Sequence, residues 1–265
     1  MIIDFNQRWR DRVGTYRPKG EPIATRDYEI ALIDTDTEAR KFVCRHHYAG
    51  SYAPAMLRAG LYRKDELVGV AVLGPGADKR AMDIALPLPG ARRAELVRFV
   101  LRDDVPANGE SWFLGHVFAL ARRRGFEALV AYSDPEPRVD VSGRTIFRGH
   151  FGCIYQATNA RYVGKTKTRT WRLFPDGTVL DDRQLTKLRE RQRGWQYVAA
   201  RLVEHGAEPP RGDFRQWRLP AIRAATRTVR HRGAHRYLWT LDTRLSRYLP
   251  DGQRYPKIDL EVPAP

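Results

Sequence analysis

A histidine–tyrosine pair, an aspartate and a second tyrosine are the residues of this chain whose types and positions best suit catalysis. His47 and Tyr48 end a predicted helix, Asp134 directly follows a predicted buried strand, and Tyr155 comes shortly after the small-residue turn at 149–152. His47 and Asp134 could bind a divalent metal, while Tyr48 or Tyr155 could donate or accept a proton. With two or three such ligands and open positions, the site would resemble a non-haem iron centre more than structural zinc.

Each of these signals also has an ordinary structural explanation. A histidine at a helix C-terminus interacts favourably with the helix dipole, and Asp134 followed by proline suits a strand-ending turn. Cys44 and Cys153 could join His46 in a thiolate site, although small buried cysteines are common. Two cysteines exclude a disulfide framework and a four-cysteine zinc site. The sequence contains no serine elbow, Walker loop or Rossmann glycine fingerprint.

Length and composition indicate a protein that buries a substantial core. The chain has 265 residues, of which 42% are hydrophobic, enough for one large domain or a medium domain with an appendage. No apolar run approaches the roughly 20 residues needed to cross a bilayer. The N-terminal residues lack the long apolar stretch of a secretion signal. We therefore expect a soluble, cytoplasmic protein with no membrane partner.

The positive charge is distributed unevenly along the chain. The formal net charge is +16, with 24 basic and 20 acidic residues over 1–160 but 23 basic and 11 acidic over 161–265. This asymmetry favours a polyanionic partner, most simply nucleic acid. The alternative is solubility combined with an arginine-rich codon bias, because only eight of the 47 basic residues are lysine.

The basic C-terminal third contains the candidate DNA-binding residues. Those suited to phosphate contacts are Lys187, Arg189, Arg191, Arg193, Arg223, Arg227, Arg230 and Arg232. Four aromatic residues lie among or close to them: Trp195, Trp217, Tyr237 and Trp239. These rings could stack on bases or sugars, or they could pack the segment onto the main domain.

The order of predicted elements indicates an α/β domain with a mixed sheet. Hydrophobic periodicity predicts strands over 28–33, 59–63, 66–73, 94–101 and 126–132, with helices over 37–47 and 110–124. Further strands are expected within 151–173 and helical structure over 181–204. The domain organisation is therefore an ill-defined arm over 1–25, a catalytic domain over 26–175 with a surface insertion at 135–148, and a basic helical extension over 176–265. We expect the extension to pack on the domain and contact DNA.

Several blocks of this sequence, in order, resemble the Mom family of phage DNA-modification proteins, relatives of the GNAT-type N-acetyltransferases. The blocks are His47-Tyr48, Glu66-Leu67-Val68-Gly69-Val70, Glu95-Leu96-Val97-Arg98, Asn108-Gly109-Glu110-Ser111, Tyr132-Ser133-Asp134-Pro135, the run from Gly149 to Asn159, His235-Arg236-Tyr237 and Tyr255-Pro256-Lys257. The resemblance covers roughly residues 28–257, and the run from Gly149 to Asn159 is its most distinctive part.

The resemblance implies a GNAT-like, mostly antiparallel mixed sheet flanked by helices. It also implies an enzyme that adds an acetamido (methylcarbamoyl) group to the exocyclic N6 amine of adenine in DNA and so protects phage DNA from restriction. His47, Tyr48, Asp134 and Tyr155 match positions implied in metal binding or catalysis. Arg98 and Ser111 match other motif positions.

The loop over 102–109 departs from the pattern of GNAT acetyltransferases. Such enzymes carry Arg/Gln-x-x-Gly-x-Gly/Ala, whose backbone amides bind the diphosphate of coenzyme A. Here Asp103, Asp104 and Pro106 stand where phosphate-binding amides are wanted. This weakens acetyl-CoA as the donor. Residues 135–148 also form an insertion relative to the family.

Two roles compete for Asp134 in a mechanism. An adenine amine is a poor nucleophile, so a site must accept its proton; Asp134 is the candidate acceptor, with Tyr155 as hydrogen-bond partner. If iron is present, Asp134 would instead be its ligand together with His47.

Direct attack on acetyl-CoA gives a carbonyl-linked acetyl group rather than a methylene-linked acetamido group. Two rival functions are a conventional acetyl-CoA-dependent N-acetyltransferase and a non-catalytic DNA-binding protein.

Overall fold

The computed structural model describes residues 5–76 and 79–256, which form two compact units. Unit 1 contains the chain up to Ser133, Phe151–Gly164 and the segment from His235 onward; unit 2 contains Asp134–His150 and Lys165–Ala234. This division differs from the predicted boundary at 175/176, because the chain leaves unit 1 twice and returns to it. Lys257 of the family-like tail and the first four residues of the predicted arm lie outside the described residues.

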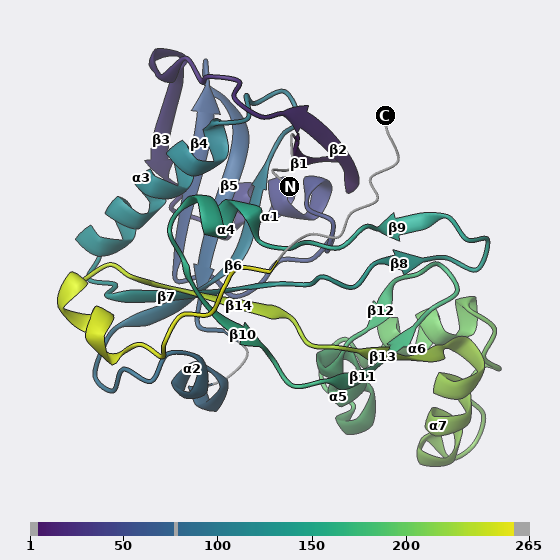
Figure 1. Cartoon of the computed structure of the whole chain (residues 1–265). Helices are drawn as coiled ribbons and strands as arrows, with labels where there is room; N and C mark the ends of the chain where they lie inside the picture. Colours follow the sequence, from purple (N-terminus) through teal and green to yellow (C-terminus); the bar gives the residue numbers. More distant parts are fainter. Residues whose placement is uncertain (1–4, 77–78, 257–265) are drawn as a thin grey trace. The chain divides into compact units, whose positions relative to one another are not determined.

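A seven-stranded sheet in the order β10-β14-β7-β6-β5-β4-β3 forms the centre of unit 1 (Figure 1). The strands are β3 (Tyr28–Leu32), β4 (Leu57–Arg63), β5 (Glu66–Gly74), β6 (Arg93–Leu101), β7 (Ala128–Ser133), β10 (Arg161–Lys165) and β14 (His235–Thr240). The registers of β3 with β4, β4 with β5, β5 with β6 and β7 with β14 are antiparallel, whereas β6 and β7 run parallel. The predicted mixed, mostly antiparallel sheet is confirmed.

Helices cover both faces of this sheet, as the predicted fold class requires. They are α1 (Asp36–His46), α2 (Lys79–Ala85), α3 (Gly109–Arg123) and α4 (Cys153–Ala157), with the 3-10 turns η1 (Thr25–Asp27) and η2 (Thr243–Tyr248). Because side chains alternate along a strand, Val70 and Val72 of β5 pack in a cluster with α1, whereas Ala71 and Leu73 pack in a cluster with α3. Full burial of a valine or leucine side chain such as these stabilises the fold by about 1.5–3 kcal/mol.

The parallel pair β6–β7 separates part of the way along. Its register ends at Glu95 opposite Val130. Beyond this point β6 continues to Leu101 against β5, while β7 continues to Ser133 against β14. The two strands therefore leave an interruption in the hydrogen-bonded sheet next to Glu95.

The predicted N-terminal arm is an ordered β-hairpin. Strands β1 (Phe5–Arg10) and β2 (Val13–Pro18) pair in antiparallel register around a turn at Asp11 and Arg12, both with positive φ. Arg8 is 1% exposed and donates to the carbonyl oxygens of Pro106 and Ala107 at 3.0 and 3.1 Å. The burial of Arg8 could not be predicted from the sequence, because an arginine is buried only where partners are present, and these partners lie far away in the chain.

Unit 2 combines short strands with three helices. The strands are β8 (Arg138–Val139), β9 (Thr145–Phe147), β11 (Arg169–Leu173), β12 (Val179–Leu180) and β13 (Arg227–His231); the helices are α5 (Asp182–Glu190), α6 (Trp195–Glu204) and α7 (Phe214–Ala225). β8 pairs with β9, and β11 lies between β12 and β13. Phe174, Leu188, Leu202 and Ile222 belong to the core that the helices share.

Three sequence-based expectations change in the structure. The insertion at 135–148 contains the β8–β9 hairpin of unit 2, and Cys153–Ala157 is a helical turn rather than a strand. The helical structure over 181–204 is divided into α5 and α6, because Arg191 ends α5 in a left-handed conformation. Within the described parts of the chain, no helix is long and apolar enough to cross a membrane.

Candidate active site

Glu95 is a half-buried acid where β6 and β7 separate. Burial raises the pKa of Glu95 to about 7, and the positive charge of Arg98 opposes this shift without cancelling it. Burial, then the charge of Glu95, raises the pKa of Tyr132 on β7 to about 12. Glu95 belongs to a block used to identify the family but had no predicted role. The signal that could have identified it is an acid flanked by Ala94 and Leu96 within a buried strand.

Arg98 follows Glu95 on the same strand and holds the segment after α1. Its guanidinium donates to the carbonyl oxygen of Ser51 at 2.8 Å and to the Ser51 hydroxyl at 2.9 Å. Burial lowers the pKa of Arg98, and the nearby acidic groups of Tyr48 and Glu95 oppose that change. The structure therefore places Arg98 within electrostatic reach of both Tyr48 and Glu95.

Tyr48 lies immediately after α1 and is held between two rings. It stacks on His47 with a centroid distance of 4.2 Å and contacts Trp9 of the N-terminal hairpin at 4.9 Å. The backbone N–H of Ala49 donates to Nδ1 of His47 at 3.1 Å. This hydrogen bond requires an unprotonated Nδ1, so the proton of a neutral His47 is on Nε2.

Tyr155 of α4 lies on the same part of unit 1. Burial raises the pKa of Tyr155, and Tyr48 and Glu95 add to the increase. Its ring, 5% exposed, packs 5.4 Å from those of Tyr237 and Trp239. A tyrosine in this environment keeps its proton at neutral pH. Tyr155 is therefore suited to donating a hydrogen bond and not to acting as a base.

Ser111 lies apart from these contacts, in the first turn of α3. Its hydroxyl donates to the carbonyl oxygen of Asn108 at 3.2 Å, a contact typical of a helix start. The contacts of Ser111 thus explain its position by local structure. Its predicted catalytic role stays a prediction.

Asp134 belongs to unit 2, where it joins a compact polar network. Oδ1 of Asp134 lies 3.0 Å from Nε2 of His231 and accepts from the backbone N–H of Glu136 at 3.0 Å. Arg138 approaches Oδ2 at 3.7 Å. The backbone N–H of Gly233 donates to Nδ1 of His231 at 3.1 Å, so Nε2 carries the proton that Asp134 accepts. These contacts give Asp134 a structural role within unit 2.

The predicted metal ligands are divided between the units, with His47 in unit 1 and Asp134 in unit 2. Residues 5–76 and 79–256 contain no group of three or more His, Cys, Asp or Glu side chains arranged to hold a metal. The carboxylate of Asp134 already accepts two hydrogen bonds. Neither unit, within its described residues, therefore brings together three such ligands for a metal.

Two glycines of the distinctive run from Gly149 to Asn159 are required by space and conformation. Gly149 has φ +92°, and a Cβ there would lie 2.5 Å from the carbonyl oxygen of Pro135. Gly152 has φ +71°, and a Cβ there would lie 2.6 Å from the Tyr237 ring and 2.8 Å from that of Tyr155. Gly152 thus lets α4 begin directly against the tyrosines of the site.

The predicted DNA-binding residues all belong to unit 2, which contains 20 basic and 10 acidic residues. Seven of them are exposed, and Lys187 is half-buried. Of the four aromatics, Trp195 and Trp217 pack against the core of unit 2. Tyr237 and Trp239 are 0% and 6% exposed in the core of unit 1, which makes them packing residues.

Comparison with protein families places the chain in the Mom protein family, whose model matches residues 27–257. The chain belongs to this family, as the sequence blocks predicted. No match was found among curated proteins.

Solved structures similar to this chain include several acetyltransferases. One is a tandem GNAT protein from the clavulanic acid biosynthesis pathway (17% identity, 56% of this chain and 48% of that chain covered, TM-score 0.37). Another is the aminoglycoside 6'-N-acetyltransferase from Enterococcus faecium (14%, 52% and 88%, 0.35). A third is a GNAT family acetyltransferase from Elizabethkingia anophelis with acetyl-CoA bound (10%, 81% and 98%, 0.34). The chain spans about half the length of the first of these.

Proposed function

We propose that this protein is a DNA-modifying transferase that adds an acetamido group to the N6 amine of adenine. Membership of the Mom family supports this substrate, because the family resemblance implies that activity. The observation that carries the chemistry is Glu95, a half-buried carboxyl group with a pKa of about 7, within electrostatic reach of Arg98 and Tyr155.

Glu95 is the proposed proton acceptor in place of Asp134. The adenine amine is weakly nucleophilic because its lone pair is delocalised into the ring. As the N6–carbon bond forms, the bond from the donor carbon to its leaving group breaks, the leaving group takes the electron pair, and the N6 proton passes to Glu95. A base works best when its pKa is near the working pH, which burial achieves for this carboxyl group.

Arg98 and Tyr155 have supporting roles in this proposal. Tyr155 keeps its proton and is suited to donate a hydrogen bond to the flipped base. Arg98 fixes the segment at Ser51 and provides positive charge beside Glu95. Unit 2, with its excess of ten basic residues, would supply the phosphate contacts to double-stranded DNA.

Mass spectrometry of nucleosides from plasmid DNA tests the proposal. Cells would express the wild-type protein, Glu95→Gln or Glu29→Gln, the last being an exposed acid of β3 that serves as a matched control. We expect a modified deoxyadenosine with the wild type and Glu29→Gln, and a strong reduction with Glu95→Gln. Unmodified adenine in every sample, although the wild-type protein is folded and binds DNA, would contradict the proposal.

The two rival functions make different predictions. A conventional N-acetyltransferase would bind acetyl-CoA saturably and acetylate a small amine or an already modified base, without changing plain adenine. A non-catalytic DNA-binding protein would leave adenine unmodified, and changes at Glu95 or Tyr155 would not alter its DNA affinity.

A further inference from the structure

The start of α3 is the place where a phosphate-binding loop is expected in a GNAT-type transferase. The first backbone N–H groups of a helix have no partner within the helix, and they favour an anion such as a diphosphate. In this chain the loop that precedes α3 is Arg102–Asn108. Whether coenzyme A fits there depends on which of its amides are still available.

This chain's own residues already bind three consecutive amides that lead into α3, those of Ala107, Asn108 and Gly109. The N–H of Ala107 donates to a carboxylate oxygen of Glu21 at 3.2 Å, and the N–H of Asn108 donates to the Glu21 carbonyl oxygen at 3.1 Å. The N–H of Gly109 donates to the carbonyl oxygen of Pro106 at 2.9 Å. Pro106 itself has no N–H to offer. Glu21 therefore occupies the position of an anionic ligand.

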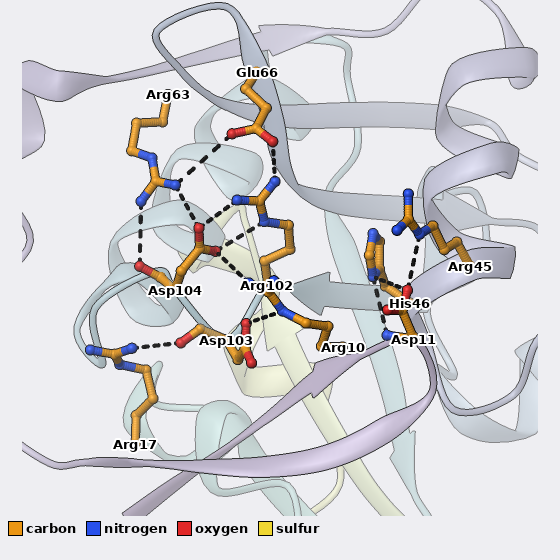
Figure 2. Close-up of polar contacts among 10 residues, drawn as sticks. All are labelled: Arg10, Asp11, Arg17, Arg45, His46, Arg63, Glu66, Arg102, Asp103 and Asp104. Atoms are coloured by element: carbon orange, nitrogen blue, oxygen red, sulfur yellow. Dashed lines mark hydrogen bonds and ion pairs between the residues drawn. The ribbon is translucent and has the colours of Figure 1, made fainter.

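The charges around the loop are balanced internally, as Figure 2 shows for most of the residues concerned. Arg10 pairs with Asp103 at 2.5 Å, and Arg17 pairs with Glu21 at 2.6 Å. Asp104 pairs with Arg63 at 2.6 Å and also with Arg102, which contacts Glu66 as well. The four arginines face the four acids Glu21, Glu66, Asp103 and Asp104. This cluster has no surplus positive charge for a diphosphate.

Glu21 and Asp104, two of the acids of this cluster, stay ionised at neutral pH. The hydrogen bond from Arg17 lowers the pKa of Glu21, and the N–H of Ala107 contributes to the same effect. Burial acts to raise the pKa of Asp104, but hydrogen bonds from Arg102 and Arg63 outweigh it and the pKa is lowered. A diphosphate would therefore meet negative charge at the loop.

The N-terminal hairpin is firmly anchored at this place. Arg8 of β1 donates to the carbonyl oxygens of Pro106 and Ala107 and forms an ion pair with Glu110 in the first turn of α3. Its side chain is fully buried. Moving the hairpin away would leave the Glu110 carboxyl without its buried counter-charge, which disfavours such a displacement.

We infer that Glu21 and the N-terminal hairpin fill the anion site of α3, so that this chain does not hold the diphosphate of coenzyme A there. The donor of the transferred group is bound without a nucleotide diphosphate at this helix. The inference rests on the contacts of the loop and holds whichever acceptor the enzyme modifies.

Hydrogen–deuterium exchange combined with calorimetry tests this inference on the full-length protein. Coenzyme A at millimolar concentration is the probe, and peptides covering residues 105–112 provide the readout. We expect no change in exchange of these amides in the wild type. Saturable binding of coenzyme A that slows exchange at Ala107–Glu110 would overturn the inference, whereas binding without this protection would place the diphosphate elsewhere and support it.

Glu21→Ala tests the occupancy of the amides directly. Without coenzyme A, loss of the carboxylate acceptor should speed exchange of the Ala107 amide by about tenfold. The Asn108 amide, which donates to the backbone carbonyl oxygen of residue 21, should exchange as in the wild type. Glu29→Ala, at an exposed position of β3, is the matched control. Unchanged exchange at Ala107 in Glu21→Ala would show that the Glu21 carboxylate does not occupy this amide. Adenine modification is measured separately, so failure of one proposal is distinguishable from failure of the other.

Discussion

Nε2 of His231 lies 3.0 Å from Oδ1 of Asp134, and the imidazole of His231 stacks on Trp171 with a centroid distance of 3.8 Å. This pair joins β13 to the segment that follows β7, entirely within unit 2. His231 is 1% exposed, so its N–H depends on Asp134 as an acceptor. Loss of activity on replacing Asp134 would therefore not by itself identify a catalytic residue.

Asp134→Ala should destabilise unit 2, whereas Asp134→Asn should largely preserve it. The alanine variant leaves the buried N–H of His231 without its acceptor, which costs about 1–3 kcal/mol; the asparagine oxygen can still accept. Urea denaturation, with limited proteolysis to locate the effect, measures the difference. If Asp134→Asn is as stable as the wild type but fails to modify adenine, the negative charge of Asp134 has a role beyond structure.

The proposed base predicts a specific pH dependence of adenine modification. Glu95 must be ionised to accept a proton, so the rate should rise with pH and level off above about 7, the pKa to which burial raises it. Glu95→Gln should lower the rate by roughly 10²–10⁴-fold. A time course of modified deoxyadenosine at several pH values measures both effects. A rate independent of pH between 5 and 8 would contradict the assignment.

Glu95 should also make folding stability depend on pH. Its pKa is raised from 4.5 to about 7 in the folded state, so the native protein binds the proton more tightly than the unfolded chain. Stability from this group is fully present below pH 4.5 and is lost as pH rises through about 7. Relative to the wild type, Glu95→Gln should gain stability over this interval, by up to about 3 kcal/mol. Unfolding curves at pH 4.5, 6 and 8 measure the gain.

The buried pair Arg8–Glu110 should contribute strongly to the folding of unit 1. Arg8→Met leaves the Glu110 carboxyl without its partner in an environment that already raises its pKa, and we expect a loss of about 3–5 kcal/mol. Adding Glu110→Gln should recover part of this loss, because the unpaired charge is gone. A double-mutant cycle in urea measures the coupling, and Arg26→Met, at a side chain 91% exposed, is the control.

Unit 2 should supply the salt-dependent part of DNA binding. Replacing Arg223 or Arg230, both exposed, with alanine removes one proposed phosphate contact each. The slope of log affinity against log salt concentration should then become shallower by about 0.9 per contact. Titrations of a DNA duplex at several salt concentrations measure this. Arg26→Ala in unit 1 should leave the slope unchanged; equal slopes for all variants would exclude these two arginines from the DNA face.

The family, the sheet and most of unit 1 could be predicted from the sequence. Alternation identified β3 and helical periodicity identified α3, because burial on one face imposes a period on neighbouring residues. An apolar run identified β5, whose residues from Val68 to Gly74 are all buried. The glycines at 149 and 152 were noted as turn residues, and their positive φ values confirm a backbone requirement. Such local signals depend on residues close together in the chain.

Contacts between distant residues were decided only by the tertiary structure. The sequence could not show that Arg8 is buried against Glu110, that Glu21 binds the amides before α3, or that His231 is the partner of Asp134. The two residues of such a contact are far apart in the chain, 86 positions for Glu21 and Ala107 and 97 for Asp134 and His231. Residue type and position selected Tyr48 and Tyr155 as candidates, and the family resemblance added Arg98. The environment of Glu95 became visible only where β6 and β7 separate.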